Sequence, residues 1–150
     1  MKKYFIYYSN SGNGDYLASL LKRSDVSLIK IEPKKHIKKM NFFRILRYGG
    51  EAMMGKKMPI QQLDLILDKG DQVVIGSPIW NDRLSTPILT LLDSYDFDKK
   101  TTKFVLYAGG GKAAHAEKQI AKMGFENKAV VLKQPLSNQE AAKEALKDIL

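Results

Sequence analysis

Cysteine is absent from the sequence, and histidine occurs only twice. Without cysteine the chain can form no disulfide, no thiolate nucleophile and no Cys-ligated zinc or iron–sulfur site. Long apolar runs are also missing, because stretches such as residues 73–75 and 129–132 fall far short of the ~20 residues that span a bilayer. The first apolar stretch gives way to a polar, Gly-containing loop instead of a cleavage site. We therefore expect no transmembrane helix, no signal peptide and a cytoplasmic location.

The length of 150 residues, of which 44% are hydrophobic, suits one globular domain over residues 1–150. A chain of this size can bury roughly two thirds of the surface that its unfolded form exposes. Disorder is therefore not expected.

Positive charge is concentrated in one part of the chain. Residues 22–58, here called the basic segment, hold eleven Lys and Arg against three acidic residues, which is +8 of the net charge of +9. A positive field from this segment can attract anions or speed encounter with them.

Apolar, β-rich stretches alternate with helical ones along the chain. Strands are predicted at residues 3–8, 26–31, 72–75, 103–107 and 129–132, the second at an edge of the sheet. Helical spacing marks residues 17–21, 88–92, 113–123 and 138–150. Within residues 34–62, Ile37, Met40, Phe43 and Leu46 suggest an amphipathic helix that Gly49 and Gly50 end. This alternation predicts a three-layer α/β domain with a five-stranded parallel sheet and helices on both faces.

Open parallel sheets bind ligands beyond the carboxyl ends of their strands. The loop after the first strand contains Ser9, Asn10, Ser11, Gly12, Asn13 and Gly14 and leads into a helix. Free N–H groups at the helix start, with the two Ser hydroxyls, can hold a phosphate, and glycine lets the backbone approach it. The loop matches neither a Walker motif nor G-x-G-x-x-G. An ordinary helix entry with polar capping residues is the alternative.

The loop predicted after the third strand covers residues 76–87 and contains the single tryptophan, Trp80. In a loop, Trp80 is badly placed for the core but well placed to cover a flat ring. Pro87 fits the first turn of the following helix. Alternatively, Trp80 plugs the junction between the loop and the helix.

Three consecutive glycines, Gly109, Gly110 and Gly111, follow the fourth strand. Their backbone groups could reach the polar edge of a planar ligand with no side chain in the way. A flexible hinge or a strand-to-helix turn is the alternative.

Together the three loops resemble those of the flavodoxin-like family of FMN-binding proteins. The phosphate loop of that family, Ser/Thr-x-Thr-G-x-Thr, is matched by residues 9–14 except that Gly14 lacks the last hydroxyl, so that its backbone N–H would serve. The second loop, with a Gly, a Pro, an aromatic and a later Pro, is matched by Gly76, Pro78, Trp80 and Pro87. The third loop aligns by position only.

The resemblance implies a flavodoxin-like sheet of order 2-1-3-4-5 and FMN as the cofactor. It assigns the phosphate to Ser9, Asn10, Ser11, Gly12, Asn13 and Gly14, and the isoalloxazine contact to Trp80. The ring pocket would be shaped by Ser77, Pro78, Ile79 and Asn81, and Gly109, Gly110 and Gly111 would line the pyrimidine side.

Two departures from the family bear on function. Asn81 and Asp82 stand where many members have a glycine after the aromatic, and the chain is basic whereas electron-carrier flavodoxins are acidic. It therefore looks closer to small flavodoxin-family reductases and quinone-linked oxidases. We expect an FMN-dependent oxidoreductase or electron carrier in which the flavin does the redox chemistry. The alternative is a module that has lost the flavin and binds or regulates through its basic segment.

The basic segment itself allows several interpretations. The plainest is a core-facing helix whose other face is solvated Lys and Arg. A docking surface for an acidic redox partner, for an anionic membrane carrying quinone or for the phosphates of NAD(P)H is the sharper one. No motif supports nucleic-acid binding. His36 and His115 have no carboxylate at ligand spacing, so we expect surface residues, with His115 close enough to the glycine loop to lie near the flavin.

Overall fold

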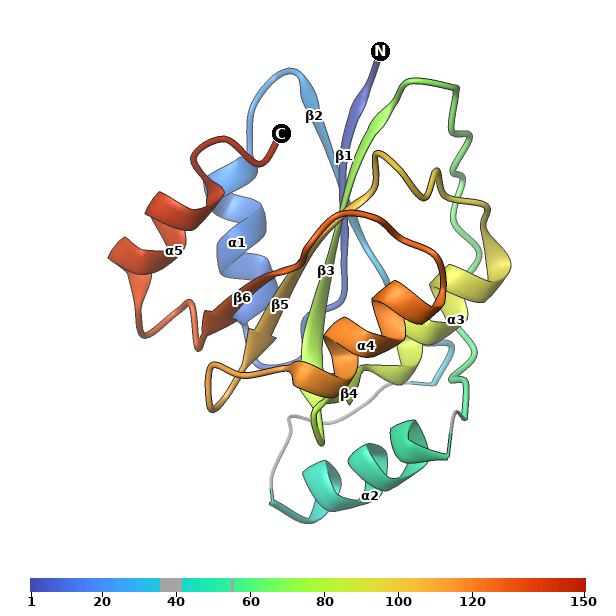
Figure 1. Cartoon of the computed structure of the whole chain (residues 1–150), viewed down its shortest axis with the longest axis vertical. Helices are drawn as coiled ribbons and strands as arrows, with labels where there is room; N and C mark the ends of the chain where they lie inside the picture. The colour runs from blue at the N-terminus through green and yellow to red at the C-terminus, as the bar shows by residue number, and fades with distance from the viewer. Residues whose placement is uncertain (36–41, 55) are drawn as a thin grey trace.

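The computed structural model describes residues 1–35, 42–54 and 56–150 (Figure 1). Its main sheet has five parallel strands in the order β2-β1-β3-β5-β6. These strands are β1 (Lys3–Tyr7), β2 (Val26–Lys30), β3 (Gln72–Trp80), β5 (Lys103–Ala108) and β6 (Val130–Lys133). The helices are α1 (Asn13–Leu21), α2 (Phe42–Met53), α3 (Thr86–Ser94), α4 (Ala114–Lys122) and α5 (Gln139–Leu146). The predicted α/β fold, with its edge strand and its strand order, is confirmed.

Helices cover both faces of the sheet, which gives three layers (Figure 1). On one face, Leu17 of α1 and Leu146 of α5 belong to a buried cluster with strand residues such as Val105. On the other face, Ile88 of α3 and Ile120 of α4 belong to a second buried cluster, together with strand residues such as Ile75. Because successive side chains of a strand point to opposite faces, the central strands must be apolar on both, and this explains their continuous apolar runs.

β3 is longer than the sequence predicted. The prediction ended it at Ile75, whereas the structure continues it to Trp80, with Pro78 paired in register with Tyr107 of β5. β1 ends opposite Gly76, so β3 has lost that neighbour by Pro78, and a proline without an N–H is tolerated where a ladder ends. Ile79 and Trp80 pair antiparallel with the two-residue strand β4 (Arg83–Leu84). The sheet therefore carries a short hairpin at its carboxyl edge that the all-parallel prediction lacked.

α2 lies beyond the carboxyl ends of the strands, at one end of the molecule (Figure 1). It confirms a helix within residues 34–62, but it runs through Gly49 and Gly50 to Met53, so the predicted end of the helix is wrong. A glycine weakens a helix by only ~1 kcal/mol, and contacts of α2 with β3, β4 and α3 can outweigh that. Ile37 and Met40, which the prediction included, lie outside the described residues.

None of the helices formed by the described residues has the length and apolar character of a membrane span.

Candidate functional site

The three predicted loops meet at the carboxyl ends of β1, β3 and β5, around a cavity of about 500 Å³. Ser11 and Asn13 line it from the first loop, residues 78–80 from the end of β3, and Gly109 from the third loop. Its volume lies in the range of ~300–1,000 Å³ that small-molecule and cofactor sites occupy. We call it the carboxyl-edge cavity.

The first loop, residues 9–14, turns at Gly12, whose φ of 94° is left-handed, and α1 begins at the next residue. The hydroxyl of Ser9 accepts the backbone N–H of Asp15 at 3.2 Å. Among the described residues, the N–H groups of Asn13 and Gly14 have no acceptor. These N–H groups, at the positive end of the α1 dipole and beside the Ser11 hydroxyl, form a donor set for an anion.

Gly14 is required by packing. A Cβ at this position would lie 2.7 Å from the Tyr107 hydroxyl oxygen, 2.8 Å from the Ser9 Cβ and 2.9 Å from the Tyr8 carbonyl oxygen. No side chain fits there without displacing its neighbours. The missing hydroxyl at position 14 is thus a consequence of how closely α1 packs on the sheet.

An acidic side chain stands in the first turn of α1, next to the donor set, but its charge is compensated. The Asp15 carboxylate is 2.9 Å from the Lys30 ammonium, and it accepts a hydrogen bond from the Tyr7 hydroxyl at 3.3 Å. Lys30 belongs to the basic segment. This part of the segment therefore limits the repulsion that Asp15 would exert on an anion held by the first loop.

The prediction that Trp80 sits in a loop outside the core is wrong. Trp80 ends β3 and is only 4% exposed. Its ring is perpendicular to that of Tyr8, with centroids 5.8 Å apart, and is tilted by 32° against that of Tyr48 in α2, with centroids 5.6 Å apart. Trp80 contributes to the wall of the carboxyl-edge cavity, but other side chains cover much of its ring. This position resembles the alternative interpretation, in which Trp80 fills the junction between the loop and the following helix.

Ser77 points into the protein. Its hydroxyl is fully buried, lies 2.8 Å from the Pro78 carbonyl oxygen and 3.2 Å from the Ser85 hydroxyl, and accepts the Ser85 N–H at 3.2 Å. These bonds tie β3 to the start of α3. Ser77 is not among the residues that line the cavity.

Asn81 and Asp82 form the two-residue turn between β3 and β4, with φ values of 50° and 59°. Two left-handed residues in a two-residue hairpin indicate a type I′ turn, which Asn and Asp adopt more readily than other non-glycine residues. Beside this turn, Asp82 Oδ2 is 2.7 Å from His115 Nδ1. This hydrogen bond is the main reason that the pKa of Asp82 lies below its usual value.

His115 is indeed a half-exposed surface residue, as expected, but it is not far from a carboxylate. Its partner Asp82 is 33 residues away in the sequence, so no local spacing could have indicated the pair. The two residues join the β3–β4 turn to the first turn of α4.

The three glycines of the third loop differ in whether the backbone and the packing require a glycine. A Cβ at Gly109 or Gly110 would meet nothing within 4 Å, whereas Gly111 has a φ of 73° and lies against Lys133. The turn requires Gly111, but the protein itself does not require Gly109 or Gly110. Their open backbone borders the carboxyl-edge cavity at Gly109 and a second hollow of about 400 Å³ at both residues, which Asp82 and Lys112 also line.

A fourth segment of the cavity was missed. Gln134, Leu136 and Ser137, which follow β6, line it together with Tyr107. Gln134 donates a side-chain N–H to the Gly109 carbonyl at 3.0 Å, and the Leu136 N–H donates to Asn13 Oδ1 at 3.0 Å. The sequence could have indicated this loop, because β6 is a parallel strand and ligands bind beyond the carboxyl ends of such strands.

Several residues predicted to bind the cofactor lie next to the cavity instead of in its wall. Of the predicted set, Ser11, Asn13, Pro78, Ile79, Trp80 and Gly109 line it, whereas Ser9, Asn10, Gly12, Gly14, Ser77, Asn81, Gly110 and Gly111 do not.

No protein-family model matches the chain, and no curated protein is significantly similar to it. Solved structures do match. A flavoprotein from Lactobacillus acidophilus, crystallised in complex with FMN, is 18% identical with a TM-score of 0.62, covering 93% of this chain and 97% of its own. A protein from Bacteroides uniformis, provisionally named a flavoprotein, is 22% identical with a TM-score of 0.71, covering 98% of both chains. Its counterpart from Bacteroides eggerthii is 19% identical with a TM-score of 0.69, covering 99% and 97%.

These likenesses extend over nearly the whole chain, while the identities are low enough that they speak for the fold alone. The chain thus has the flavodoxin-like fold that its three loops predicted, shared with structures of flavoproteins.

Proposed function

We propose that the chain binds FMN in the carboxyl-edge cavity and acts as an electron carrier or an FMN-dependent oxidoreductase. The observation that carries the proposal is the donor set at the start of α1, which borders a cofactor-sized cavity at the edge where parallel sheets bind ligands. The Lactobacillus acidophilus flavoprotein, which shares the fold, was crystallised with FMN.

The residues of the first loop fit a phosphate. The N–H groups of Asn13 and Gly14 and the Ser11 hydroxyl can donate to its oxygens, and Gly12 keeps a side chain out of the approach. Asn13 Oδ1 is already bonded to the Leu136 N–H, which fixes the orientation of its amide. The phosphate end of FMN would therefore bind at residues 11–14.

The ring of FMN would lie against the end of β3 and the glycine loop. Pro78 and Ile79 offer apolar surface, Trp80 adds the uncovered part of its ring, and Gly109 offers backbone polar groups. When bound, FMN supplies the chemistry of accepting and releasing electrons, singly or as hydride. The residues of the chain bind it, orient it and exclude water from one side, and no side-chain acid or base is needed for that role.

The phosphate assignment is tested with a pair of serine variants. Ser11→Ala removes a hydroxyl at the cavity, whereas Ser19→Ala removes an exposed hydroxyl that donates to the Tyr16 carbonyl within α1. We expect Ser11→Ala to weaken FMN binding by about five- to tenfold and Ser19→Ala to leave it unchanged, in equilibrium titrations. Equal affinities for the two variants would contradict the assignment.

A carrier and a reductase differ in whether the protein oxidises a nicotinamide directly. Rapid oxidation of NADH or NADPH by the FMN-loaded protein with a quinone acceptor would support the reductase. Loaded protein that oxidises neither, but passes electrons to or from a second redox protein, would support the carrier.

A flavin-free binding module is the second candidate, and one observation favours it. Trp80 is covered by Tyr8 and Tyr48, so it offers less ring surface than a stacking platform would. Purified protein with no visible flavin band and no response to added FMN would support this candidate over the first.

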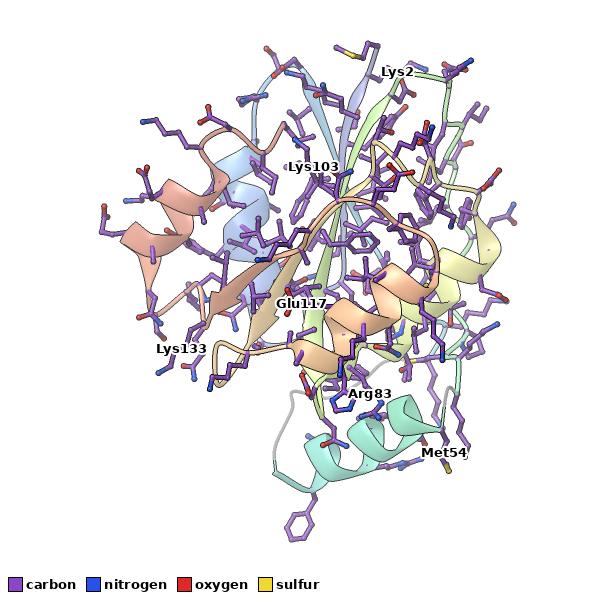
Figure 2. The ribbon with its side chains drawn as sticks, in the orientation of Figure 1. Lys2, Met54, Arg83, Lys103, Glu117 and Lys133 are labelled. Atoms are coloured by element: carbon purple, nitrogen blue, oxygen red, sulfur yellow. The ribbon has the colours of Figure 1, made fainter. Side chains whose placement is uncertain are left out.

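Partner docking is proposed at α2, which belongs to the basic segment. Phe43 in α2 and Met54, the residue directly after α2, are 78% and 67% exposed (Figure 2 labels Met54). Between them on the same helical face lies Arg47, which is exposed and is 3.7 Å from the Glu51 carboxylate. Apolar side chains flanking a cation suit an anionic membrane surface, and Tyr48 of the same helix contacts Trp80.

We expect the protein to co-sediment with phosphatidylglycerol vesicles but not with phosphatidylcholine vesicles. The bound fraction should decrease with added salt, and binding should be lost in a Phe43→Ser, Met54→Ser variant. If vesicles do not bind, an acidic redox protein becomes the candidate partner.

A further inference from the structure

Tyr107 connects β5 to the first loop. Its side chain is almost wholly buried, and its hydroxyl donates a hydrogen bond to the backbone carbonyl of Tyr8, the residue that precedes the loop. Tyr107 also lines the carboxyl-edge cavity. A residue 99 positions away in the sequence thus contacts the start of the predicted phosphate loop.

The hydroxyl of Tyr107 occupies space that a side chain at position 14 would need. A Cβ on Gly14 would be 2.7 Å from this oxygen, so the two groups exclude each other. The hydroxyl that residue 14 lacks is therefore replaced, under the first turn of α1, by one that comes from β5.

The backbone of Tyr8 is held by hydrogen bonds on both sides of its Cα. Its N–H donates to the Gly76 carbonyl at 3.2 Å, and its carbonyl accepts the Tyr107 hydroxyl. Ser9, the next residue, accepts the Asp15 N–H. Hydrogen bonds therefore fix the loop that carries the donor set at both ends, at Tyr8 before it and at the first turn of α1 after it.

Tyr107 stays a donor under all ordinary conditions. Burial raises the pKa of its hydroxyl well above the usual value, so it keeps its proton and places no negative charge beside the loop.

We propose that Tyr107 is a positioning residue for phosphate binding: its hydroxyl fixes the Tyr8 carbonyl, and through it the arrangement of the loop N–H groups. This inference rests on the proposed FMN binding and specifies how the phosphate, as distinct from the ring, is recognised. It predicts that loss of the hydroxyl weakens binding of the phosphate-bearing flavin selectively.

The test compares FMN with riboflavin, which lacks the phosphate, on the full-length apo-protein. Tyr107→Phe should lower the affinity for FMN about tenfold, the effect of losing one buried hydrogen bond, and leave riboflavin affinity within about twofold. Tyr16→Phe is the matched control, because it removes a buried hydroxyl from α1 that has no partner among the described residues. It should change neither affinity.

Thermal melting of each variant reports whether it folds. If Tyr107→Phe alone unfolds too easily, the same substitution is made in the Tyr16→Phe background, which should be stabilised by removal of an unpaired buried hydroxyl.

The outcomes separate the two proposals. An equal loss of FMN and riboflavin affinity, or no loss of either, would overturn the positioning role and leave FMN binding intact. A wild-type protein that binds riboflavin as tightly as FMN overturns the phosphate site and this inference with it. Wild-type protein that binds neither flavin overturns the proposed function as well.

Discussion

Individual side chains at the carboxyl edge serve packing and binding at once. Ser9 accepts the Asp15 N–H in the first turn of α1, Ser77 ties β3 to α3, and Asn13 holds the loop after β6 through the Leu136 N–H. A substitution at such a residue changes stability as well as affinity. Matched pairs of variants separate the two effects.

Gly14 and Gly109 form one such pair. Gly14→Ala should destabilise the apo-protein by about 2 kcal/mol, because the added Cβ meets Tyr107, Ser9 and Tyr8 at under 3 Å. Gly109→Ala should change stability by less than about 0.5 kcal/mol, since nothing lies within 4 Å of its Cβ, yet it should weaken FMN binding. Urea unfolding and flavin titration measure the two quantities. Equal stabilities of the two variants would contradict the close packing assigned to Gly14.

Asp82 makes stability depend on acid pH. Its folded-state pKa is lowered by the His115 hydrogen bond, so the stabilisation is present above the unfolded-state value near 3.8 and is lost as the pH falls through the lower folded-state pKa. We expect Asp82→Asn to lose stability at neutral pH, with the difference from wild type shrinking below pH ~4. Unfolding midpoints between pH 7 and pH 2.5 test this.

The control for that measurement is Asp96→Asn, which alters an exposed carboxylate that has no hydrogen-bond partner among the described residues. It should follow the wild-type pH dependence. A wild-type-like acid limb for Asp82→Asn would contradict the assigned contact between Asp82 and His115.

At the scale of elements, the strands and helices followed from hydrophobic periodicity. β1, β3 and β5 are apolar on both faces, and α4 and α5 repeat their buried residues at helical spacing. Periodicity could not reveal that β3 extends through Gly76 and Pro78 to Trp80, because both residues usually interrupt strands. The extension depends on pairing with β5, which is distant in the sequence, and with β4, which follows β3 after a two-residue turn.

The candidate site was predictable to the extent that strand ends define it. Ser11, Asn13, Pro78, Ile79 and Gly109 do meet at the cavity. The covering of Trp80 by Tyr48, and the contact of Tyr107 with Gly14, depend on packing between elements, which a single sequence does not disclose.

α2 offers a prediction of its own. Gly50 lies inside this helix, and a Cβ there would meet nothing within 4 Å. Gly50→Ala should therefore stabilise α2 by up to ~1 kcal/mol through higher helix propensity. Slower amide hydrogen exchange over Phe42–Met53 would show the gain, with unchanged exchange in the central strands as the internal control. Faster exchange in α2 would contradict its helical assignment.

At the scale of the whole molecule, part of the positive charge of the basic segment is paired with carboxylates. Arg23 pairs with Asp25 at 3.0 Å, Lys30 with Asp15 at 2.9 Å and Lys57 with Asp93 at 2.7 Å. Half-exposed ion pairs of this kind contribute little to stability. The basic segment still carries a net positive charge, which produces a field that draws anions toward the molecule.

Titration of the apo-protein with FMN and with riboflavin, followed by fluorescence of the single tryptophan, tests the central claim most directly. A flavin bound at the end of β3 lies beside Trp80 and should quench it, and FMN should bind at least tenfold more tightly than riboflavin because of the first loop. That result would support the cavity and the phosphate site together. No quenching by FMN, with no flavin band in the purified protein, would contradict the account.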